Sequence, residues 1–214
     1  MTGSSSQVTT PQQTWDDESA LCAEELMPRV ITGALLQTIR KYFCDADNIR
    51  SELLQSYVWN SDKRLTKIDI VTPELWDKTR VEKRPAVLVK RAAVRSRNLA
   101  IDDSAGESEH GTHYVVQIAG SHVVTAVART AGCADELAQS IWFDLIRWAP
   151  AFRSDLGLRI FRAPELGPVQ RVNDESWEHY VSGLTATWVY EGEWVLKVEE
   201  LPIKRIDINI ETRT

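Results

Sequence analysis

Apolar side chains recur at helical spacing between Thr130 and Phe152, and this is the most regular pattern in the chain. Leu137, Ile141 and Leu145 follow one another at intervals of four, and Trp148 comes three positions later. Three neighbours widen the stripe: Trp142, Ile146 and Ala149. The pattern predicts a helix of about four turns with one broad, buried apolar face.

Charged residues and proline indicate where this central helix begins and ends. Asp135 and Glu136 are expected in its first turn, where negative charge meets the positive end of the helix dipole. Pro150 is expected to end the helix, because proline lacks the N–H group that the helical hydrogen-bond ladder requires.

A second helix is predicted to begin with Pro28 in its first turn, where proline is tolerated. Residues with helical spacing follow: Ile31, Ala34, Leu35, Thr38, Ile39, Tyr42 and Phe43. Weaker patterns predict a short helix or partly ordered lead-in at 16–26 and a short helical turn at 51–59.

Alternation with a period of two predicts strands before the central helix. Short strands are expected at 65–71 and 86–94. Residues 114–127 are expected to form a hairpin with Gly120-Ser121 as its two-residue turn. The connection at 97–111 is polar, and we expect it to be a mobile loop or an interaction arm.

Further strands are predicted after the central helix. A short apolar strand at 158–161 and a turn at 164–168 precede the longest strand candidate, 178–190. The dipeptide Glu191-Gly192 is expected to turn this strand back into a returning strand at 194–198. Helix and sheet signals together predict an antiparallel sheet with the central helix across one face.

Apolar and polar residues alternate near the C-terminus, where Ile206, Ile208 and Ile210 stand between Asp207, Asn209 and Glu211. Such a pattern predicts a last strand with one apolar face. This face is expected to cover apolar surface in its own subunit or in the next one.

The domain organisation follows from these patterns. Residues 1–15 are rich in Ser, Thr and Gln and are expected to form a flexible N-terminal arm. Residues 16–214 are expected to form a single α/β domain with a long polar loop at 95–111. The predicted fold class is α+β, with helices packed on one face of a mixed, mainly antiparallel sheet.

Composition narrows the function. The formal net charge is -6, so the chain has no overall basic footprint for nonspecific DNA binding. Three cysteines without a CxxC spacing argue against a disulfide framework and a zinc site. No apolar run approaches the roughly 18 residues of a membrane span and no signal peptide is evident, so we expect assembly in the cytoplasm.

Two groups of residues are candidate metal ligands. His113 and His122 flank the expected hairpin turn, but a third ligand at suitable spacing is missing, so we interpret both as strand residues. The acidic residues of the polar loop lack EF-hand spacing and are interpreted as solvated. They are Asp102, Asp103, Glu107 and Glu109.

Cys133 is a candidate nucleophile, since a helix start lowers the pKa of a thiol. No companion His or Asn motif accompanies it, and no GxSxG, HExxH or P-loop pattern occurs. We therefore predict no catalytic residue, no cofactor and no metal.

The chain contains eight tryptophans, most of which are expected in the core. Trp76 and Trp177 stand in turn-like contexts with charged neighbours, which is typical of protein interfaces. With Ile206, Ile208 and Ile210 they are the predicted interface residues.

The order of these elements carries a family resemblance over roughly 28–210, with diffuse motifs and no signature residue. The segments that carry it are Arg40-Lys41-Tyr42-Phe43, Ile68-Asp69-Ile70, Arg84-Pro85-Ala86-Val87-Leu88-Val89, Gly120-Ser121-His122-Val123-Val124, Asp135-Glu136-Leu137-Ala138 and the long hairpin around Trp188 and Trp194. Together they resemble the neck and tail-terminator proteins of tailed bacteriophages.

The resemblance implies a structural virion protein without catalytic residues. Subunits of that family close into a ring, usually of six, that ends the tail tube and joins it to the head connector. The implied partners are the major tail tube protein and the connector or adaptor proteins, with genomic DNA passing through the lumen unbound. Two alternatives stay open: another ring adaptor, at the head-completion or baseplate side, and a small metal-dependent hydrolase that uses the acidic loop.

Overall fold

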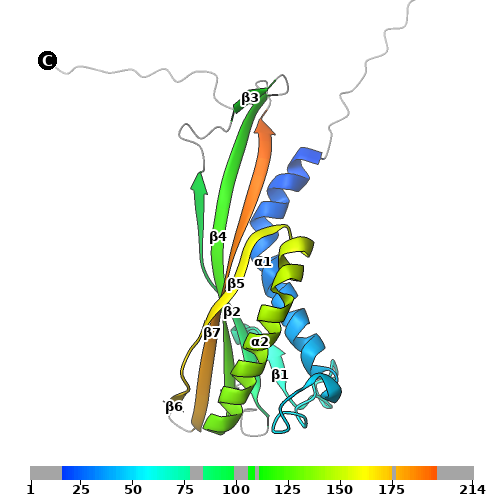
Figure 1. Ribbon diagram of the computed structural model, residues 1–214, viewed down its shortest axis with the longest axis vertical. Helices are drawn as coiled ribbons and strands as arrows, with labels where there is room; N and C mark the ends of the chain where they lie inside the picture. Colours follow the sequence, from blue (N-terminus) through cyan, green and yellow to red (C-terminus); the bar gives the residue numbers. More distant parts are fainter. Residues whose placement is uncertain (1–15, 78–83, 99–105, 109–110, 175–176, 197–214) are drawn as a thin grey trace, which may run out of the picture.

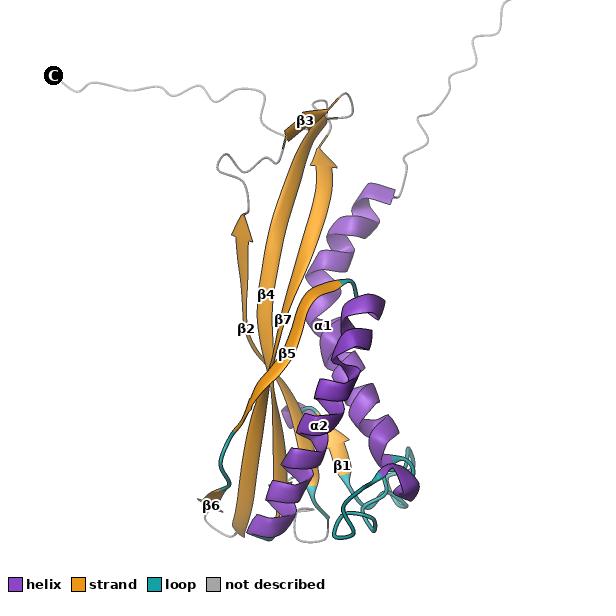
Figure 2. Ribbon diagram, viewed as in Figure 1, coloured by secondary structure: helices purple, strands orange, loops and turns teal. Residues whose placement is uncertain are grey.

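The structure is a computed structural model that describes residues 16–77, 84–98, 106–108, 111–174 and 177–196 (Figure 1). Seven strands form one mixed sheet, and two long helices lie on one of its faces (Figure 2). The predicted α+β fold class is therefore confirmed.

Two long antiparallel strands form the centre of the sheet. β4 (Gly111–Ala128) and β7 (Trp177–Leu196) pair from Thr112 opposite Leu196 to Ala128 opposite Tyr180. The remaining strands are β1 (Asp69–Val71), β2 (Ala86–Asn98), β3 (Gly106–Ser108), β5 (Leu158–Leu166) and β6 (Gln170–Asp174). The main order is β1-β2-β4-β7-β5, with β3 paired to β4 and β6 paired to β7. β1 runs parallel to β2, and the other described pairs are antiparallel.

The two helices divide the covered face between them. α2 (Ala131–Asp155) contacts β5, β7 and β4, and α1 (Asp16–Phe43) contacts β2 and β1. Figure 1 shows both helices on the same side of the sheet, with β4 and β7 continuing past the end of α2. The end of the β4–β7 pair at Thr112 and Leu196 therefore projects beyond α2.

Alternation along the strands places the main core between helices and sheet. Its largest fully buried side chains include Trp188, Phe43, Ile31, Leu35, Ile39, Leu137, Ile141 and Leu145. Each such side chain contributes about 1.5–3 kcal/mol by leaving water. A smaller cluster of Ala86, Leu88 and Val127 lies on the other face of the sheet, where Trp76 packs against it.

Two predicted hairpin turns are wrong. β4 runs straight through Gly120-Ser121, and β7 runs straight through Glu191-Gly192, so the predicted returning strand at 194–198 begins as the end of β7. The glycine of the first pair serves packing, because Gly120 lies opposite Trp188 and a side chain there would collide with the indole. Gly192 likewise pairs with Val116 inside the long ladder.

The start of α2 also differs from the prediction. The helix begins at Ala131, and the Thr130 side chain caps it by accepting a hydrogen bond from the Cys133 N–H at 3.3 Å. Asp135 and Glu136 therefore lie beyond the first turn, where the dipole has little effect on them.

The end of α2 lies past Pro150, which does not terminate it as predicted. Phe152 is buried and stacks on Phe161 of β5, with ring centroids 4.3 Å apart, so the last turn is fixed to the sheet despite the lost hydrogen bond. Gly157, with φ of 62°, then turns the chain into β5.

α1 begins at Asp16, so Pro28 lies inside the helix and not in its first turn. The predicted lead-in at 16–26 is therefore the first part of one long helix. Pro28 is buried, and its carbonyl accepts a hydrogen bond from the Thr32 hydroxyl at 2.8 Å.

Other segments depart less from expectation. The predicted helical turn at 51–59 consists of turns and irregular backbone, and a short 3₁₀ helix, η1 (Ala46–Asn48), precedes it. The strand at 65–71 is shortened to β1, and a second 3₁₀ helix, η2 (Pro73–Leu75), follows. The polar connection at 97–111 is partly sheet, since β2 extends to Asn98 and β3 pairs with β4; 99–105 and 109–110 lie outside the described residues.

A buried polar chain joins α1 to both central strands. The Trp188 indole N–H donates to His122 Nδ1 at 3.1 Å, and His122 Nε2 lies 2.8 Å from Thr32 Oγ1. Because Nδ1 accepts, the proton is assigned to Nε2, which donates to Thr32. The fully buried imidazole is thus neutral and satisfied, and burial lowers the pKa of His122 from 6.5 to about 4.

No helix among the described residues has the length and apolar character needed to cross a membrane.

Candidate functional site

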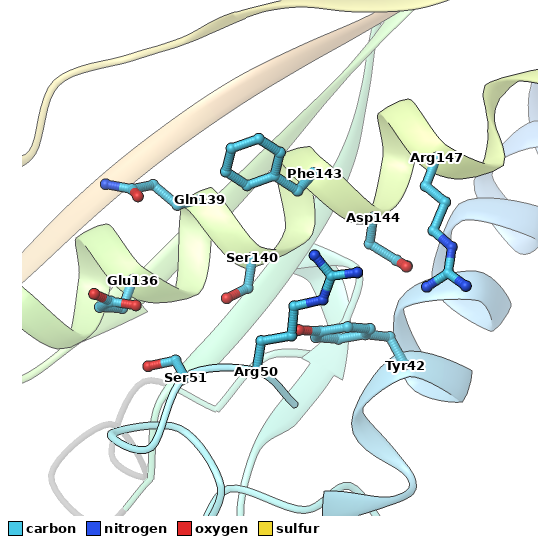
Figure 3. A pocket seen from close by; sticks show the side chains of 9 residues that line it. All are labelled: Tyr42, Arg50, Ser51, Glu136, Gln139, Ser140, Phe143, Asp144 and Arg147. Carbon is cyan, nitrogen blue, oxygen red and sulfur yellow. The ribbon is translucent and has the colours of Figure 1, made fainter. Parts of the chain in front are cut away.

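A concavity with many polar lining residues lies between the end of α1, the segment that follows α1, and α2. It measures about 520 Å³, and Figure 3 shows its lining side chains. They are Tyr42, Arg50, Ser51, Glu136, Gln139, Ser140, Phe143, Asp144 and Arg147. We refer to it as the α1–α2 pocket.

Asp144 is the unusual member of this pocket. Its side chain is only 6% exposed, because residue 144 lies close to the apolar stripe of α2, between Ile141 and Trp148. The side chain of Trp148 hydrogen-bonds to the carboxylate, yet the buried Oδ2 atom has no hydrogen-bond partner.

Desolvation raises the pKa of Asp144 from 3.8 to about 6. The Trp148 hydrogen bond and the positive charges of Arg147 and Arg50 oppose this increase without cancelling it. Figure 3 shows the two guanidinium groups on either side of the carboxylate. An unsatisfied buried acceptor normally costs about 1–3 kcal/mol, so a group that donates to Oδ2 would be bound favourably.

Apolar side chains are exposed in the pocket lining and beside it. Phe143 is 59% exposed, Ile146 44% and Trp148 38%. The prediction that Ile146 and Trp148 belong to a buried face is therefore wrong. The buried stripe of α2 is therefore narrower than expected. Trp148 lies at its edge, where Lys41 of α1 makes a cation–π contact with the indole at 5.6 Å.

A second concavity of about 480 Å³ lies beside Trp76, between η2 and the end of α1. Arg40 lines this concavity. Its guanidinium group donates a hydrogen bond to the Ile70 carbonyl at 2.8 Å and lies 5.3 Å from the ring centre of Trp59. Leu75 beside Trp76 is 75% exposed, and the buried indole Nε1 of Trp76 has no hydrogen-bond partner.

Of the predicted interface residues, the structure describes the side chain of Trp76 alone. Trp76 is half-buried against the open face of the sheet, so part of it belongs to the core of its own subunit. Trp177 begins β7, and its side chain is not described. Ile206, Ile208 and Ile210 lie outside the described residues.

The residues weighed as metal ligands are not brought together where they are described. His113 and His122 lie on one strand, about 30 Å apart at the rise of a β-strand, and do not flank a turn. Glu107 belongs to β3, whereas Asp102, Asp103 and Glu109 lie outside the described residues. Within the described ranges, no three His, Cys, Asp or Glu side chains lie close enough to hold a metal ion.

Cys133 behaves differently from the expectation for a helix start. Burial raises the pKa of its thiol, which outweighs a hydrogen bond from Tyr57. The thiol is therefore protonated at neutral pH, and its environment is that of a core residue.

Sequence reasoning missed Asp144 and Phe143. A signal existed for Asp144, since a carboxylate three positions after Ile141 and four before Trp148 falls among the apolar positions of the helix. The exposure of Phe143 depends on what covers α2, which helical spacing does not contain. Comparison of the chain with known protein families and with curated proteins finds no match.

Proposed function

We propose that this protein is a structural virion protein of a tailed phage that forms a homo-oligomeric ring at the head–tail junction. In this role it terminates the tail tube and joins it to the head connector. The sequence resemblance to neck and tail-terminator proteins supports the proposal, and so does the α+β fold with both helices on one face of the sheet.

The observation that carries the proposal is the exposure of large apolar side chains at two separate places on the subunit. Phe143, Ile146 and Trp148 are exposed on α2, whereas the exposed Leu75 belongs to η2, beside Trp76, which packs on the other face of the sheet. Groups of exposed large apolar side chains are typical of surfaces that contact other chains. Two different surfaces on one subunit allow the head-to-tail contact that closes a ring.

Charge is compatible with a ring around DNA. With a net charge of -6, a lumen that is on average acidic repels phosphate and lets the duplex pass without being held. In the proposed role, the partners are the tail tube protein on one side and connector or adaptor proteins on the other. Assembly takes place in the host cytoplasm and the mature location is the virion.

The experiment combines native mass measurement with negative-stain imaging of the protein alone and after incubation with tail tubes. We expect rings of identical subunits, on tube ends or free, and tubes that stop growing. Replacing Phe143 and Ile146 by serine should abolish the rings while the secondary structure by circular dichroism stays unchanged. Tubes that grow at the same rate with and without the protein would contradict a terminator.

Cross-linking distinguishes the other ring adaptors. Links to the tube protein favour a terminator, and links confined to the portal side favour a head-completion adaptor. The hydrolase alternative is tested by metal analysis together with Asp102→Ala and Asp103→Ala; a turnover that disappears in these variants while rings persist would overturn the structural role.

A further inference from the structure

Helix α2 carries a second stripe of residues on the side opposite its buried stripe. Gln139, Phe143, Ile146 and Pro150 recur at spacings of three and four, so they share one face of the helix. At the centre of this face Phe143 is 59% exposed and Ile146 44%. Pro150 is also exposed, and Figure 3 shows the Phe143 ring directed away from Asp144. We refer to this face as the outer stripe of α2.

Opposite charges stand on one flank of the outer stripe. Asp135 and Arg153 are 18 positions apart, which is about five helical turns, so both lie on the same side of α2. The helical rise separates them by about 27 Å along the axis. Arg153 is exposed, and the half-buried Asp135 accepts a hydrogen bond from Gln139 at 2.9 Å. This flank is therefore acidic near the start of α2 and basic near its end.

The outer stripe and its charged flank share one midpoint. Phe143 and Ile146 are centred halfway between positions 144 and 145, and so are Gln139 and Pro150. The charged positions 135 and 153 are centred on position 144. A two-fold axis at this level therefore brings all three pairs opposite one another in two antiparallel copies of α2. A partner of different sequence would leave this coincidence of midpoints unexplained.

We propose that two copies of this chain pair through the outer stripes of their α2 helices, antiparallel and about a two-fold axis. Phe143 then packs against Ile146 of the second copy, and Asp135 faces Arg153 of the second copy. Because the contact is two-fold symmetric, each of these interactions is made twice.

Charge favours the antiparallel direction over the parallel one. Parallel helices would place the two Asp135 carboxylates at one level and the two Arg153 guanidinium groups at another, which like-charge repulsion opposes. Antiparallel helices set each acid against a base, and their dipoles also run in opposite directions.

The other flank of the outer stripe is compatible with the same pairing. Glu136 lies 18 positions before Ser154, and Ser140 lies seven positions before Arg147, so each of these two pairs shares a side of α2. Their midpoints fall within about one position of the same axis. Each charged side chain on this flank therefore comes to the level of a hydroxyl group, which can hydrogen-bond to either sign of charge.

The contact is small, because one helix of each copy supplies it and its apolar centre consists of Phe143 and Ile146. Small interfaces are typical of weak, reversible association, so we expect a dissociation constant on the order of micromolar. The pairing goes beyond the proposed function and competes with it, since the proposed ring contact uses the same two side chains. A paired subunit is thus a form of the free protein that separates before it joins a ring.

Sedimentation velocity of the full-length chain over a concentration series tests the pairing. The wild type should form a two-chain species. Asp135→Arg and Arg153→Glu should each weaken this species by about tenfold, because each change sets like charges against each other at both ends of the contact. An equal mixture of the two variants should associate to within about threefold of the wild type, since every acid then faces a base again.

Arg64→Glu is the matched control, because it makes the same charge change at an exposed arginine outside α2. It should leave association unchanged, and every variant should unfold within a few degrees of the wild type. The pairing is refuted if the wild type forms no two-chain species at any concentration, if the single variants associate as the wild type does, or if their mixture fails to recover. Weaker capping of tube ends by variants with unchanged self-association would assign the outer stripe to a different protein and also refute the pairing.

These outcomes are separable from those of the proposed function, because the charge variants retain Phe143 and Ile146. A two-chain species together with tubes that ignore the protein supports the pairing and argues against the terminator role. Capped tubes without a two-chain species leave the terminator role standing and overturn the pairing.

Discussion

Gly120 of β4 lies directly opposite Trp188 of β7, and the indole fills the space that a side chain at position 120 would need. A Cβ atom there would come within 2.9 Å of Trp188 Cη2 and closer still to two other ring atoms. Trp188 is fully buried and hydrogen-bonded to His122. Its ring therefore cannot move aside without breaking the hydrogen bonds that connect it through His122 to Thr32 of α1.

Gly120→Ala should therefore destabilise the protein by about 1–3 kcal/mol, the usual cost of overpacking a core. Urea denaturation followed by tryptophan fluorescence measures the change. Gly132→Ala is the matched control, since no atom lies within 4 Å of a Cβ at that position, and it should stay within about 0.5 kcal/mol. Equal stability of the two variants would show that the indole adapts.

His122 should make the protein less stable in acid. The folded state keeps the imidazole neutral down to pH about 4, whereas the unfolded chain takes up a proton below about 6.5. The unfolded state then binds more protons, so the free energy of unfolding falls as pH drops from 6.5 to 4, by about 3 kcal/mol from this group. His122→Gln should remove this dependence, measured by urea denaturation at pH 4.5, 5.5 and 7.

Asp144 should act in the opposite direction. Its pKa is about 6 in the folded state and 3.8 in the unfolded chain, so the folded state binds the extra proton between these values. The free energy of unfolding from this group falls as pH rises from 3.8 to 6, by about 3 kcal/mol. The two opposing groups make the wild type nearly insensitive to pH between 4 and 6 as far as they contribute.

Asp144→Asn separates the two contributions. The difference in unfolding free energy between this variant and the wild type should change by about 3 kcal/mol from pH 4 to pH 8, in favour of the variant at high pH. A constant offset between the two proteins does not affect this comparison. Parallel pH profiles would mean that the carboxylate finds a partner in solution.

Phe152 and Phe143 offer a comparison within one helix. Phe152→Ala removes a buried ring stacked on Phe161 and should cost about 3–5 kcal/mol, with fraying of α2 after Pro150. Phe143→Ala changes a side chain that is 59% exposed and should alter stability by about 0.5 kcal/mol or less while weakening self-association. Thermal unfolding and hydrogen exchange of the last turn of α2 measure the first effect; a fully protected last turn would contradict it.

The spacing of apolar residues predicted the helices and strands whose buried side follows a regular pattern along the sequence. The spacing of Leu137, Ile141 and Leu145 located the buried side of α2, and alternation in 178–190 located the strand β7, in which Leu184 and Trp188 are buried. Both patterns report contacts that an element makes along its whole length. For the same reason the fold class could be inferred from the sequence.

Predictions of turns from dipeptides and of helix ends from proline were wrong where contacts with a residue far along the chain determine the local structure. Gly120 reads as a turn residue locally, but Trp188, far along the chain, determines its role. Pro150 reads as a helix end, but Phe161 holds the next turn in place. Of the candidate site, the position of Asp144 was accessible from the sequence, whereas its missing donor depends on side chains from α1 and the following segment.

The pairing of β4 with β7 also governs how fast the chain can fold. Ala128 and Tyr180 close a loop of about 50 residues, and Thr112 and Leu196 one of about 80, because α2, β5 and β6 lie between the two strands. Pairing that starts at Ala128 and Tyr180 closes the shorter of the two loops first. We therefore expect α2 to dock on the sheet before the far end of the β4–β7 pair, at Thr112 and Leu196, forms. Such nonlocal pairing places the folding time in the range of milliseconds to seconds.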